Sequence, residues 1–398
     1  MTLGVYEHEV LDRVEKLLPV LRERAQETED LKRIPDQTIT DLRATGVLQL
    51  MQPTQWGGYA AEPVLVYDAI RRISRACGST GWITSVFGIH PWHLALFDQQ
   101  AQQEVWGADR EALICSSYAP MGAGLQVDGG FRVSGAWRYS SGCDHADWAL
   151  LGGPVLADGA PVLVDGMPQF GSFLIPKADF TVDPVWDTFG LAGTGSNTVV
   201  VQDVFVPEHR FLSFYAMNDG TMPGVAVNTE PVYRMPWGTI LPTGLSTPVL
   251  GMAEGARDIY VEYQRERWRA AFVGEQAKND PYVTERVGRV SSDIDASWRQ
   301  LAGHIVEEYQ TILAGQEVSI DTRLDARRDQ VRATQRCVAA IDVFMESAGA
   351  AALSKGTPLQ RLFRDAHAAR VHATNEAEKV YDMYGQYKFG RDPMLIMV

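Results

Sequence analysis

The sequence predicts an α+β protein in which a helical region, a β region and a second helical region follow one another. Two observations predict this order. Between about residues 111 and 212, apolar residues alternate or form short runs between glycines, as in strands. On both sides of that stretch they recur at helical spacing over longer runs. We therefore expect an N-terminal helical domain (1–110), a central β-barrel or sandwich domain (111–212) and a C-terminal four-helix bundle (213–398).

The first region begins with a helix whose apolar positions follow helical spacing: Val14, Leu17, Leu18 and Leu21. Pro35 and Asp36 open a second, short helix, which Gly46 ends. A third helix is expected over 63–76, with Gly78 as its stop signal.

The stretch 82–97 is almost entirely apolar, and Pro91 interrupts it. It is shorter than the roughly 18–20 apolar residues of a membrane span. Because proline usually ends or kinks a helix, we expect a pair of buried helices here.

The β region opens with a hairpin, in which the strands 125–127 and 131–133 flank the turn Asp128-Gly129-Gly130. The later strands are predicted from their short apolar runs: 149–153, 172–175 and 198–206.

Residues 213–238 carry several prolines and glycines and predict a loop-rich connection to the last domain. The chain after Pro242 is helical almost to its end. Its four long helical segments are predicted at about 244–273, 282–315, 322–354 and 358–385. Such helices bury their apolar stripes against one another in a bundle.

The composition excludes several classes of protein. The 36 basic and 50 acidic residues give a net charge of −14, which argues against binding nucleic acid. No run is apolar enough to span a membrane, and Met1–Val10 lacks a signal-peptide pattern. We therefore expect a cytoplasmic protein. The four cysteines form no CxxC pair, so no metal site is predicted.

No nucleotide-binding or hydrolase motif is present. The sequence has no GxGxxG, no Walker lysine loop, no HExxH and no GxSxG. If the protein is an enzyme, a cofactor held in another way would supply the chemistry.

Three segments rich in small and hydroxyl residues suit such a cofactor: Ser116–Gly124, Trp137–Gly142 and Gly190–Asn197. Their hydroxyls and backbone amides match the edge of a flat heteroaromatic ring, and the neighbouring aromatic side chains match its face. Each segment taken alone is more typical of an ordinary β-turn, and only the three together, in this order of domains, favour a cofactor site.

These segments resemble the flavin-contacting segments of the acyl-CoA dehydrogenase fold, with the last of them running into Val204–Pro207. Arg364–His367 is similar to the "RDAK" helix of that fold, and the resemblance covers essentially the whole chain. Gly78–Trp82, His90–Phe97 and Ser140–His145 resemble the flavin-dependent aromatic hydroxylases within it, above all those that act on a seco-steroid phenol.

The resemblance implies the oxygenase component of a two-component monooxygenase. A separate NAD(P)H:flavin reductase would supply reduced FAD or FMN by diffusion. Reduced flavin and O2 would form a C4a-hydroperoxide, which transfers oxygen to the aromatic substrate, for a phenol at the carbon ortho to its hydroxyl. Indoles and polycyclic natural products remain alternative substrates.

The expected position of the base separates hydroxylation from acyl-CoA dehydrogenation, which needs a carboxylate. In the segment 371–375, which follows the "RDAK"-like helix, Ala373 stands at the position that usually carries the catalytic glutamate of the dehydrogenases. In some relatives that glutamate comes from the first helix of the C-terminal bundle, and here the corresponding segment 237–253 contains no acid. A dehydrogenase is therefore disfavoured, and a flavin-storing scaffold is the non-enzymatic alternative. His372 becomes the candidate base, since an imidazole can accept a phenol proton at neutral pH.

The resemblance implies roles for further residues, each of which could instead be structural. Ser141 would contact flavin N5 or O4 and act in catalysis with His372. Trp82, His90 and Ser116 would contact substrate. The resemblance places seven residues in the flavin site: Ser116, Tyr139, Ser141, Thr194, Ser196, Arg269 and Asn375. Arg269 would reach a flavin phosphate, often that of a neighbouring subunit, and the fold implies a homotetramer.

Overall fold

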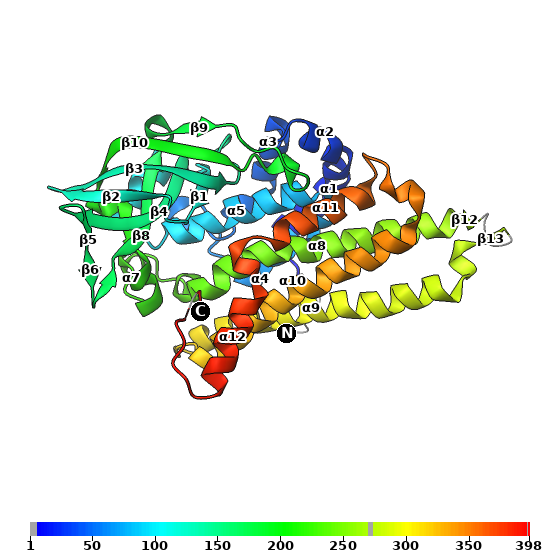
Figure 1. Cartoon of the computed structure of the whole chain (residues 1–398). Coiled ribbons are helices and arrows are strands. Elements are labelled where there is room, and N and C mark those ends of the chain that lie inside the picture. The colour runs from blue at the N-terminus through cyan, green and yellow to red at the C-terminus, as the bar shows by residue number, and fades with distance from the viewer. Residues whose placement is uncertain (1–5, 270–273, 396) are drawn as a thin grey trace.

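A computed structural model describes residues 6–269, 274–395 and 397–398, with Arg269 described for its backbone alone. Helices come first along the chain, a β domain follows, and long helices complete the molecule (Figure 1). The predicted α+β architecture is confirmed. Among the described residues, no helix combines the length and apolar character needed to cross a membrane.

From residue 6 onward, six α-helices precede the β domain: α1 (Glu9–Glu23), α2 (Ala25–Asp30), α3 (Asp36–Thr45), α4 (Pro63–Ala76), α5 (Gly78–Leu94) and α6 (Gln99–Trp106). The predicted helices α1, α3 and α4 are confirmed. Helix α3 ends at Gly46, whose φ of +81° favours glycine. Helix α4 ends at Ala76 with Cys77 as its C-cap, and Gly78, the predicted stop signal, is the first residue of α5.

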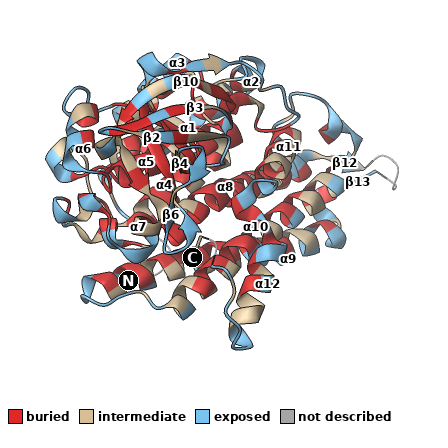
Figure 2. Cartoon of the chain, turned by 60° about the vertical axis from the view of Figure 1, so that its left-hand side comes forward, coloured by how far each residue is buried: buried red, intermediate tan, exposed pale blue. Residues whose placement is uncertain are grey.

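The predicted helix pair over 82–97 is wrong, because α5 is one continuous helix that contains Pro91. Pro91 lies in its last turn, where a missing N–H removes a single hydrogen bond and does not break the helix. Helix α5 is buried on nearly all sides. Its apolar composition therefore reflects a position in the centre of the molecule (Figure 2).

The β domain contains one main path of strands in the order β11-β8-β4-β2-β3-β10-β9, with β1 and β5 also paired to β4. The first part of β4 pairs in parallel with β1, and its last part with β2. The principal strands are β1 (Ile114–Ser117), β2 (Gly122–Val127), β3 (Gly130–Ser140), β4 (Trp148–Ala157), β8 (Phe170–Pro176), β9 (Thr181–Asp183), β10 (Asn197–Pro207) and β11 (Phe211–Ser213). All strands predicted from the sequence are confirmed, including the hairpin, in which Val127 pairs with Gly130.

The short helix α7 (Phe214–Asp219) and two 3-10 turns occupy the connection that follows the β domain. The bundle helices come next: α8 (Trp237–Glu266), α9 (Pro281–Leu313), α10 (Ile320–Ala348), α11 (Pro358–Arg370) and α12 (Ala377–Lys388). A small pair of strands, β12 (Trp268–Arg269) and β13 (Glu275–Gln276), lies between α8 and α9.

Two boundaries in the bundle differ from the sequence-based prediction. Helix α8 begins at Trp237 and contains both Pro242 and Pro248. The hydroxyl of Ser85 donates to the Gly244 carbonyl at 2.6 Å, and this is the carbonyl that Pro248 leaves without its helical donor. The fourth predicted segment is two helices, because the chain turns after Arg370 and α12 begins only at Ala377.

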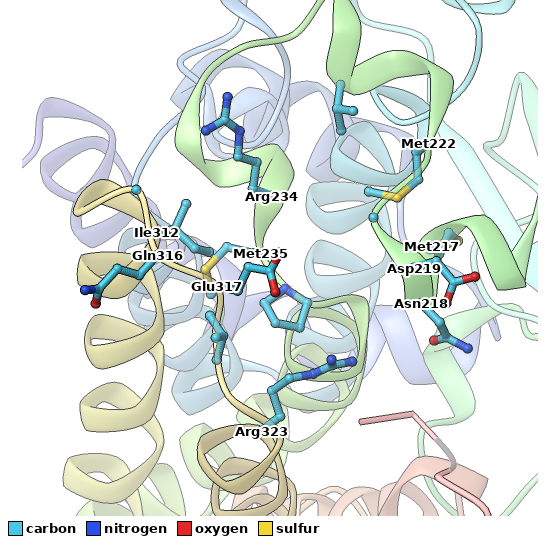
Figure 3. A pocket seen from close by; sticks show the side chains of 15 residues that line it. Met217, Asn218, Asp219, Met222, Arg234, Met235, Ile312, Gln316, Glu317 and Arg323 are labelled. Carbon is cyan, nitrogen blue, oxygen red and sulfur yellow. The ribbon is translucent and has the colours of Figure 1, made fainter.

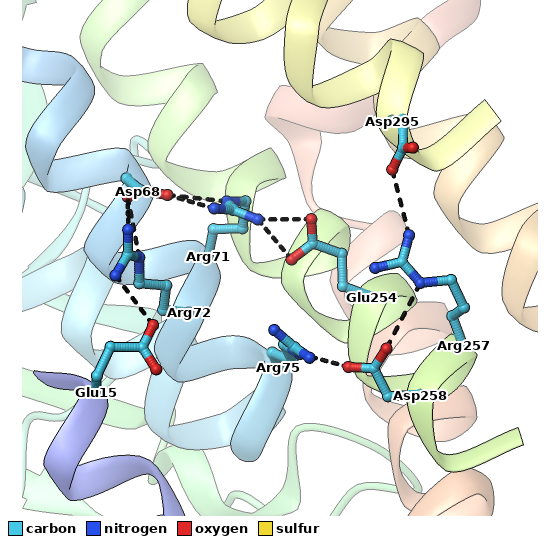
Figure 4. Close-up of polar contacts among 9 residues, drawn as sticks. All are labelled: Glu15, Asp68, Arg71, Arg72, Arg75, Glu254, Arg257, Asp258 and Asp295. Carbon is cyan, nitrogen blue, oxygen red and sulfur yellow. Dashed lines mark hydrogen bonds and ion pairs between the residues drawn. The ribbon is translucent and has the colours of Figure 1, made fainter. Parts of the chain in front are cut away.

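Helices α4 and α8 approach closely through small residues and a buried ion network (Figure 4). A Cβ atom on Gly251 of α8 would lie 2.2 Å from the Arg71 carbonyl oxygen of α4, so only glycine fits. The Arg71 Nη1 donates to both carboxylate oxygens of Glu254, at 2.6 and 2.8 Å, and its Nη2 donates to Asp68 at 2.5 Å.

We expect Arg71→Met to lower the free energy of unfolding by about 3–5 kcal/mol, because it leaves the buried Glu254 carboxylate without its partner. Arg289→Met is the matched control. It breaks an ion pair with Glu285 in which both side chains are 56% exposed, and we expect a loss of about 0.5 kcal/mol or less. Urea unfolding of both variants measures the difference, and equal losses would contradict a dominant role for the buried pair.

Candidate active site

A cavity of about 600 Å³ lies where the N-terminal helices, the β domain and the bundle meet. Helix α5, strands β1 and β3, helix α8 and the loop after α11 supply its walls. Six of the residues predicted from the sequence line this one cavity: Trp82, His90, Ser116, Tyr139, Ser141 and His372. Segments up to 290 positions apart in the sequence therefore converge, as the resemblance implied.

Ser141 begins a chain of hydrogen-bonded hydroxyl groups on the cavity wall. The indole Nε1 of Trp82 donates to Ser141 Oγ at 3.0 Å. Ser141 Oγ lies 2.8 Å from Ser196 Oγ, which lies 2.7 Å from Thr194 Oγ1. The chain ends where Thr194 Oγ1 donates to the Leu191 carbonyl at 2.8 Å.

The direction of these hydrogen bonds follows from counting protons. Three short oxygen–oxygen contacts need three protons, and the three hydroxyl groups carry one each, because a carbonyl carries none. Thr194 therefore donates to Leu191, Ser196 to Thr194, and Ser141 to Ser196. Ser141 also accepts from Trp82, so only an accepting lone pair of its oxygen remains for a molecule in the cavity.

His372 lies in the turn that separates α11 from α12. Its Nδ1 accepts the backbone N–H of Thr374 at 3.2 Å and lies 2.9 Å from the Thr374 hydroxyl. In a neutral ring the proton is then on Nε2. The ring is accessible to water from the open cavity, yet protein surrounds it, and this desolvation lowers the pKa of His372. The imidazole is therefore neutral at pH 7.

His90 presents the opposite tautomer. Its Nδ1 lies 2.6 Å from the Ile114 carbonyl oxygen, so Nδ1 carries the proton and Nε2 holds a lone pair. Burial lowers the pKa of His90 to about 4, so this ring is also neutral at pH 7. The two histidines thus offer the cavity one nitrogen that accepts a proton and one N–H that donates.

Sequence reasoning missed Tyr118, although it lies in the loop 116–124 that the sequence singled out. Tyr118 lines the cavity, and its hydroxyl lies 2.7 Å from Nδ1 of the buried His93. Ser172 Oγ lies 3.3 Å from Nε2 of the same ring. The apolar wall from Leu241 and Leu245 of α8 was also missed, because nothing in a helical run marks which face meets a cavity.

No aspartate or glutamate is among the described residues that line the cavity. The first acid of α8, Glu254, points instead toward α4, where it binds Arg71. Glu376, the carboxylate nearest to His372 in sequence, pairs with Lys379 at 3.0 Å. The site therefore lacks the carboxylate that α-proton abstraction from an acyl thioester requires.

Four predicted cofactor residues lie outside the cavity lining. Thr194 and Ser196 lie behind Ser141 in the hydroxyl chain. Asn375 is buried behind the His372 turn, where its Nδ2 donates to the Ala369 carbonyl at 3.0 Å. Arg269 belongs to β12 at the far end of α8, and its side chain lies outside the described residues.

A second hollow lies apart from this site, between α7, the 3-10 turns and the α9–α10 connection (Figure 3). Its volume is about 420 Å³, and Arg234, Arg323 and Glu317 give it a polar lining. It shares no described lining residue with the first cavity. None of the predicted site residues lies in it.

The first cavity fits a flavin ring. Ser116 and Ser141 would provide hydroxyl groups for the polar edge of the isoalloxazine, while Trp82, Val86, Leu241 and Leu245 would provide apolar surface for its faces. Gly142 lets the backbone pass close to α5, because a Cβ atom there would lie 2.6 Å from the Phe87 ring.

Comparison with known proteins agrees with this geometry. Family models for the acyl-CoA dehydrogenase N-terminal and C-terminal domains match residues 7–109 and 243–377. The chain is 60% identical to the flavin-dependent monooxygenase oxygenase subunit HsaA of Rhodococcus jostii, over 96% of this chain and 98% of that one. Its identity to the HsaA subunit of Mycobacterium tuberculosis is 55%, over 98% and 97% of the two chains.

A solved structure is equally similar. The crystal structure of 3-HSA hydroxylase from Rhodococcus sp. RHA1 superimposes with a TM-score of 0.95 at 60% identity, covering 98% of this chain and all of that chain.

Fold and site together define a flavin-dependent oxidoreductase with the acyl-CoA dehydrogenase fold that lacks the dehydrogenase carboxylate. Within that class, the chain belongs to the flavin-dependent aromatic monooxygenases, as an oxygenase subunit. Its cofactor is reduced flavin, which a separate reductase component provides. Bound reduced flavin activates O2 and supplies one oxygen atom to the aromatic substrate.

Proposed function

We propose that this oxygenase hydroxylates a phenol ortho to its hydroxyl group, with a phenolic seco-steroid as the substrate. One observation carries the proposal: two neutral histidines of opposite tautomer line a cavity in which no described lining residue is acidic. The high identity to a 3-HSA hydroxylase supports the substrate class. The volume of about 600 Å³ is in the range that binds a polycyclic molecule.

His90 and His372 would hold the substrate oxygen between them. The bare Nε2 of His90 accepts the phenol proton, and the Nε2–H of His372 donates to the same oxygen. The phenolate that forms beside His90 raises the pKa of its ring above the value without substrate, because an opposite charge stabilises the imidazolium. Removing the proton raises the electron density at the ortho carbon, which favours oxygen transfer. This assignment differs from the sequence-based hypothesis, in which His372 alone is the base, because Thr374 occupies Nδ1 of His372.

Ser141 would accept a hydrogen bond from flavin N5–H. Its own proton is directed toward Ser196, so its oxygen faces the cavity as an acceptor. Reduced flavin carries a proton on N5 and oxidised flavin does not. The hydroxyl chain that ends at Leu191 thus favours the reduced cofactor, which matches a cofactor that arrives reduced from another protein.

We expect His90→Asn to slow hydroxylation by about 10²–10⁴-fold, the usual contribution of a general base. We expect His372→Asn to slow it by about 10-fold, since it removes one neutral hydrogen-bond donor. In both variants, reduced flavin should still be oxidised by O2, so that H2O2 replaces product. Measuring product and H2O2 per reduced flavin consumed tests this.

His367→Asn is the matched control, because His367 binds Asp342 at 2.7 Å and does not line the cavity. Wild-type coupling in both His90→Asn and His372→Asn, in folded protein, would contradict the phenol-deprotonation mechanism. A larger defect in His372→Asn than in His90→Asn would restore His372 as the base.

The hydroxyl chain predicts a shift in flavin preference for Thr194→Val, which keeps the shape of Thr194 but removes its hydroxyl. Ser196 can then donate to Ser141, and Ser141 can turn its proton toward the flavin. We expect the affinity ratio of reduced to oxidised flavin to fall by about 3–10-fold, the value of one hydrogen bond. Anaerobic titration with both redox states measures the ratio.

Thr188→Val serves as the control for this experiment. Thr188 lies in the same loop, and its hydroxyl donates to the Gly190 carbonyl at 3.0 Å, outside the chain of hydroxyls. A ratio that stays at the wild-type value in Thr194→Val would show that Ser141 does not sense the redox state of the flavin.

We further propose a homotetramer built as a dimer of dimers, in which Arg269 contacts the flavin phosphate of a neighbouring subunit. Large apolar side chains are exposed around the bundle, including Val371 beside the site, Leu353 and Phe389. Light scattering at micromolar concentration should give four times the chain mass. A monomer would overturn both the assembly and the role of Arg269 across subunits.

A further inference from the structure

Arg327 of α10 is a buried cation without a counter-charge. The residue is 4% exposed, and its Nη1 donates to the Gln330 side-chain oxygen. Its Nε has no hydrogen-bond partner among the described residues, and no carboxylate of that part of the chain forms an ion pair with it. Burial lowers the pKa of Arg327 to about 10, so the guanidinium stays charged at pH 7.

The buried Arg361 and the partly buried Arg71 show how unusual this is. Arg361, which is 7% exposed, donates to Glu29 at 3.0 Å. Arg71 binds both Glu254 and Asp68. A buried charge without a partner costs several kcal/mol, so the position of Arg327 calls for a group that the chain itself does not provide.

Arg327 lines a cavity of about 350 Å³ that adjoins the active-site cavity. Ala373 and Met397 line both cavities, so they form the boundary between them. The two carboxylates in the described lining of the smaller cavity bind other residues of that lining and not Arg327, since Glu376 pairs with Lys379 and Asp382 accepts from Gln386 at 2.7 Å.

We propose that Arg327 binds an acceptor oxygen of a ligand that extends from the active-site cavity into this smaller cavity. The chemistry is a charge-assisted hydrogen bond from guanidinium to an anionic or carbonyl oxygen. Two groups provide such an oxygen: a carbonyl or carboxylate at the end of the substrate opposite its phenol, or the phosphate of the flavin. The identity of the ligand rests on the proposed function, whereas the unpaired cation does not.

The contacts of Arg327 continue to the catalytic turn. Gln330 Nε2 donates to Asn375 Oδ1 at 2.8 Å, and Asn375 holds the Ala369 carbonyl at the end of α11. This turn carries His372. A ligand oxygen at Arg327 would therefore be fixed relative to the histidine that faces the reacting end of the substrate.

The first test uses the stability of the full-length protein without ligand. Arg327→Met removes an uncompensated buried charge and keeps the length of the side chain, so we expect the thermal midpoint to rise or stay unchanged. Arg361→Met is the matched control, and its midpoint should fall because Glu29 loses one of its two arginine partners and Gln26 loses its donor. A fall in Arg327→Met as large as that in Arg361→Met would overturn the inference, since Arg327 would then be a structural residue.

The second test measures binding. Anaerobic titrations compare reduced FMN with reduced riboflavin, and equilibrium titrations compare a phenol that carries a distal carbonyl with the same phenol lacking it. We expect Arg327→Met to reduce one of these two preferences by about 10–100-fold, the value of a hydrogen bond to a charged group. If the variant loses the preference for FMN over riboflavin, the ligand of Arg327 is the flavin phosphate. If it loses the preference for the phenol with a distal carbonyl, the ligand is the substrate.

Unchanged preferences in both titrations would overturn the inference. This failure is distinct from failure of the proposed function. If no phenol is hydroxylated, the substrate assignment is lost, yet the thermal midpoint and the comparison of FMN with riboflavin still report on Arg327.

Discussion

The close approach of α4 to α8 is the constraint on which the rest of the molecule depends. Gly251 of α8 lies against the Arg71 carbonyl, and Gly255 lies against that of Arg75 in the same way. At this distance the two helices have little room for side chains between them. Their polar contacts are the ion network around Arg71 and Glu254 and the hydrogen bond from Tyr67 to the Ile240 carbonyl. Helix α8 is thereby fixed against the N-terminal helices, and Leu241 and Leu245 near its N-terminus form the apolar wall of the active site.

The sequence predicted the order of domains and most of the elements, because strand alternation, helical spacing and glycine stops are local signals. It failed where tertiary contacts override a local rule. Pro91 and Pro248 are tolerated because one lies in a last turn and Ser85 bonds to the carbonyl that the other leaves free. The turn around His372, which divides the last helix, carries no glycine or proline at all.

The same limit applies to the site. The motifs indicated Trp82 and Ser141, which the fold brings into contact at 3.0 Å. They could not indicate the tautomers of His90 and His372, since these depend on the Ile114 carbonyl and the Thr374 amide. Nor could they reveal the unpaired charge of Arg327, because a helical arginine in a sequence is indistinguishable from one with a partner.

The walls of the active-site cavity come from segments far apart in the sequence, from Trp82 in α5 to Met397. Contacts between residues so distant in sequence form late in folding, because long loops must close first. A partly folded chain therefore holds no enclosed place for reduced flavin and O2. Assembly of the cavity acts as a safeguard, since a chain that has not completed its fold cannot bind the cofactor in a reactive geometry and release peroxide.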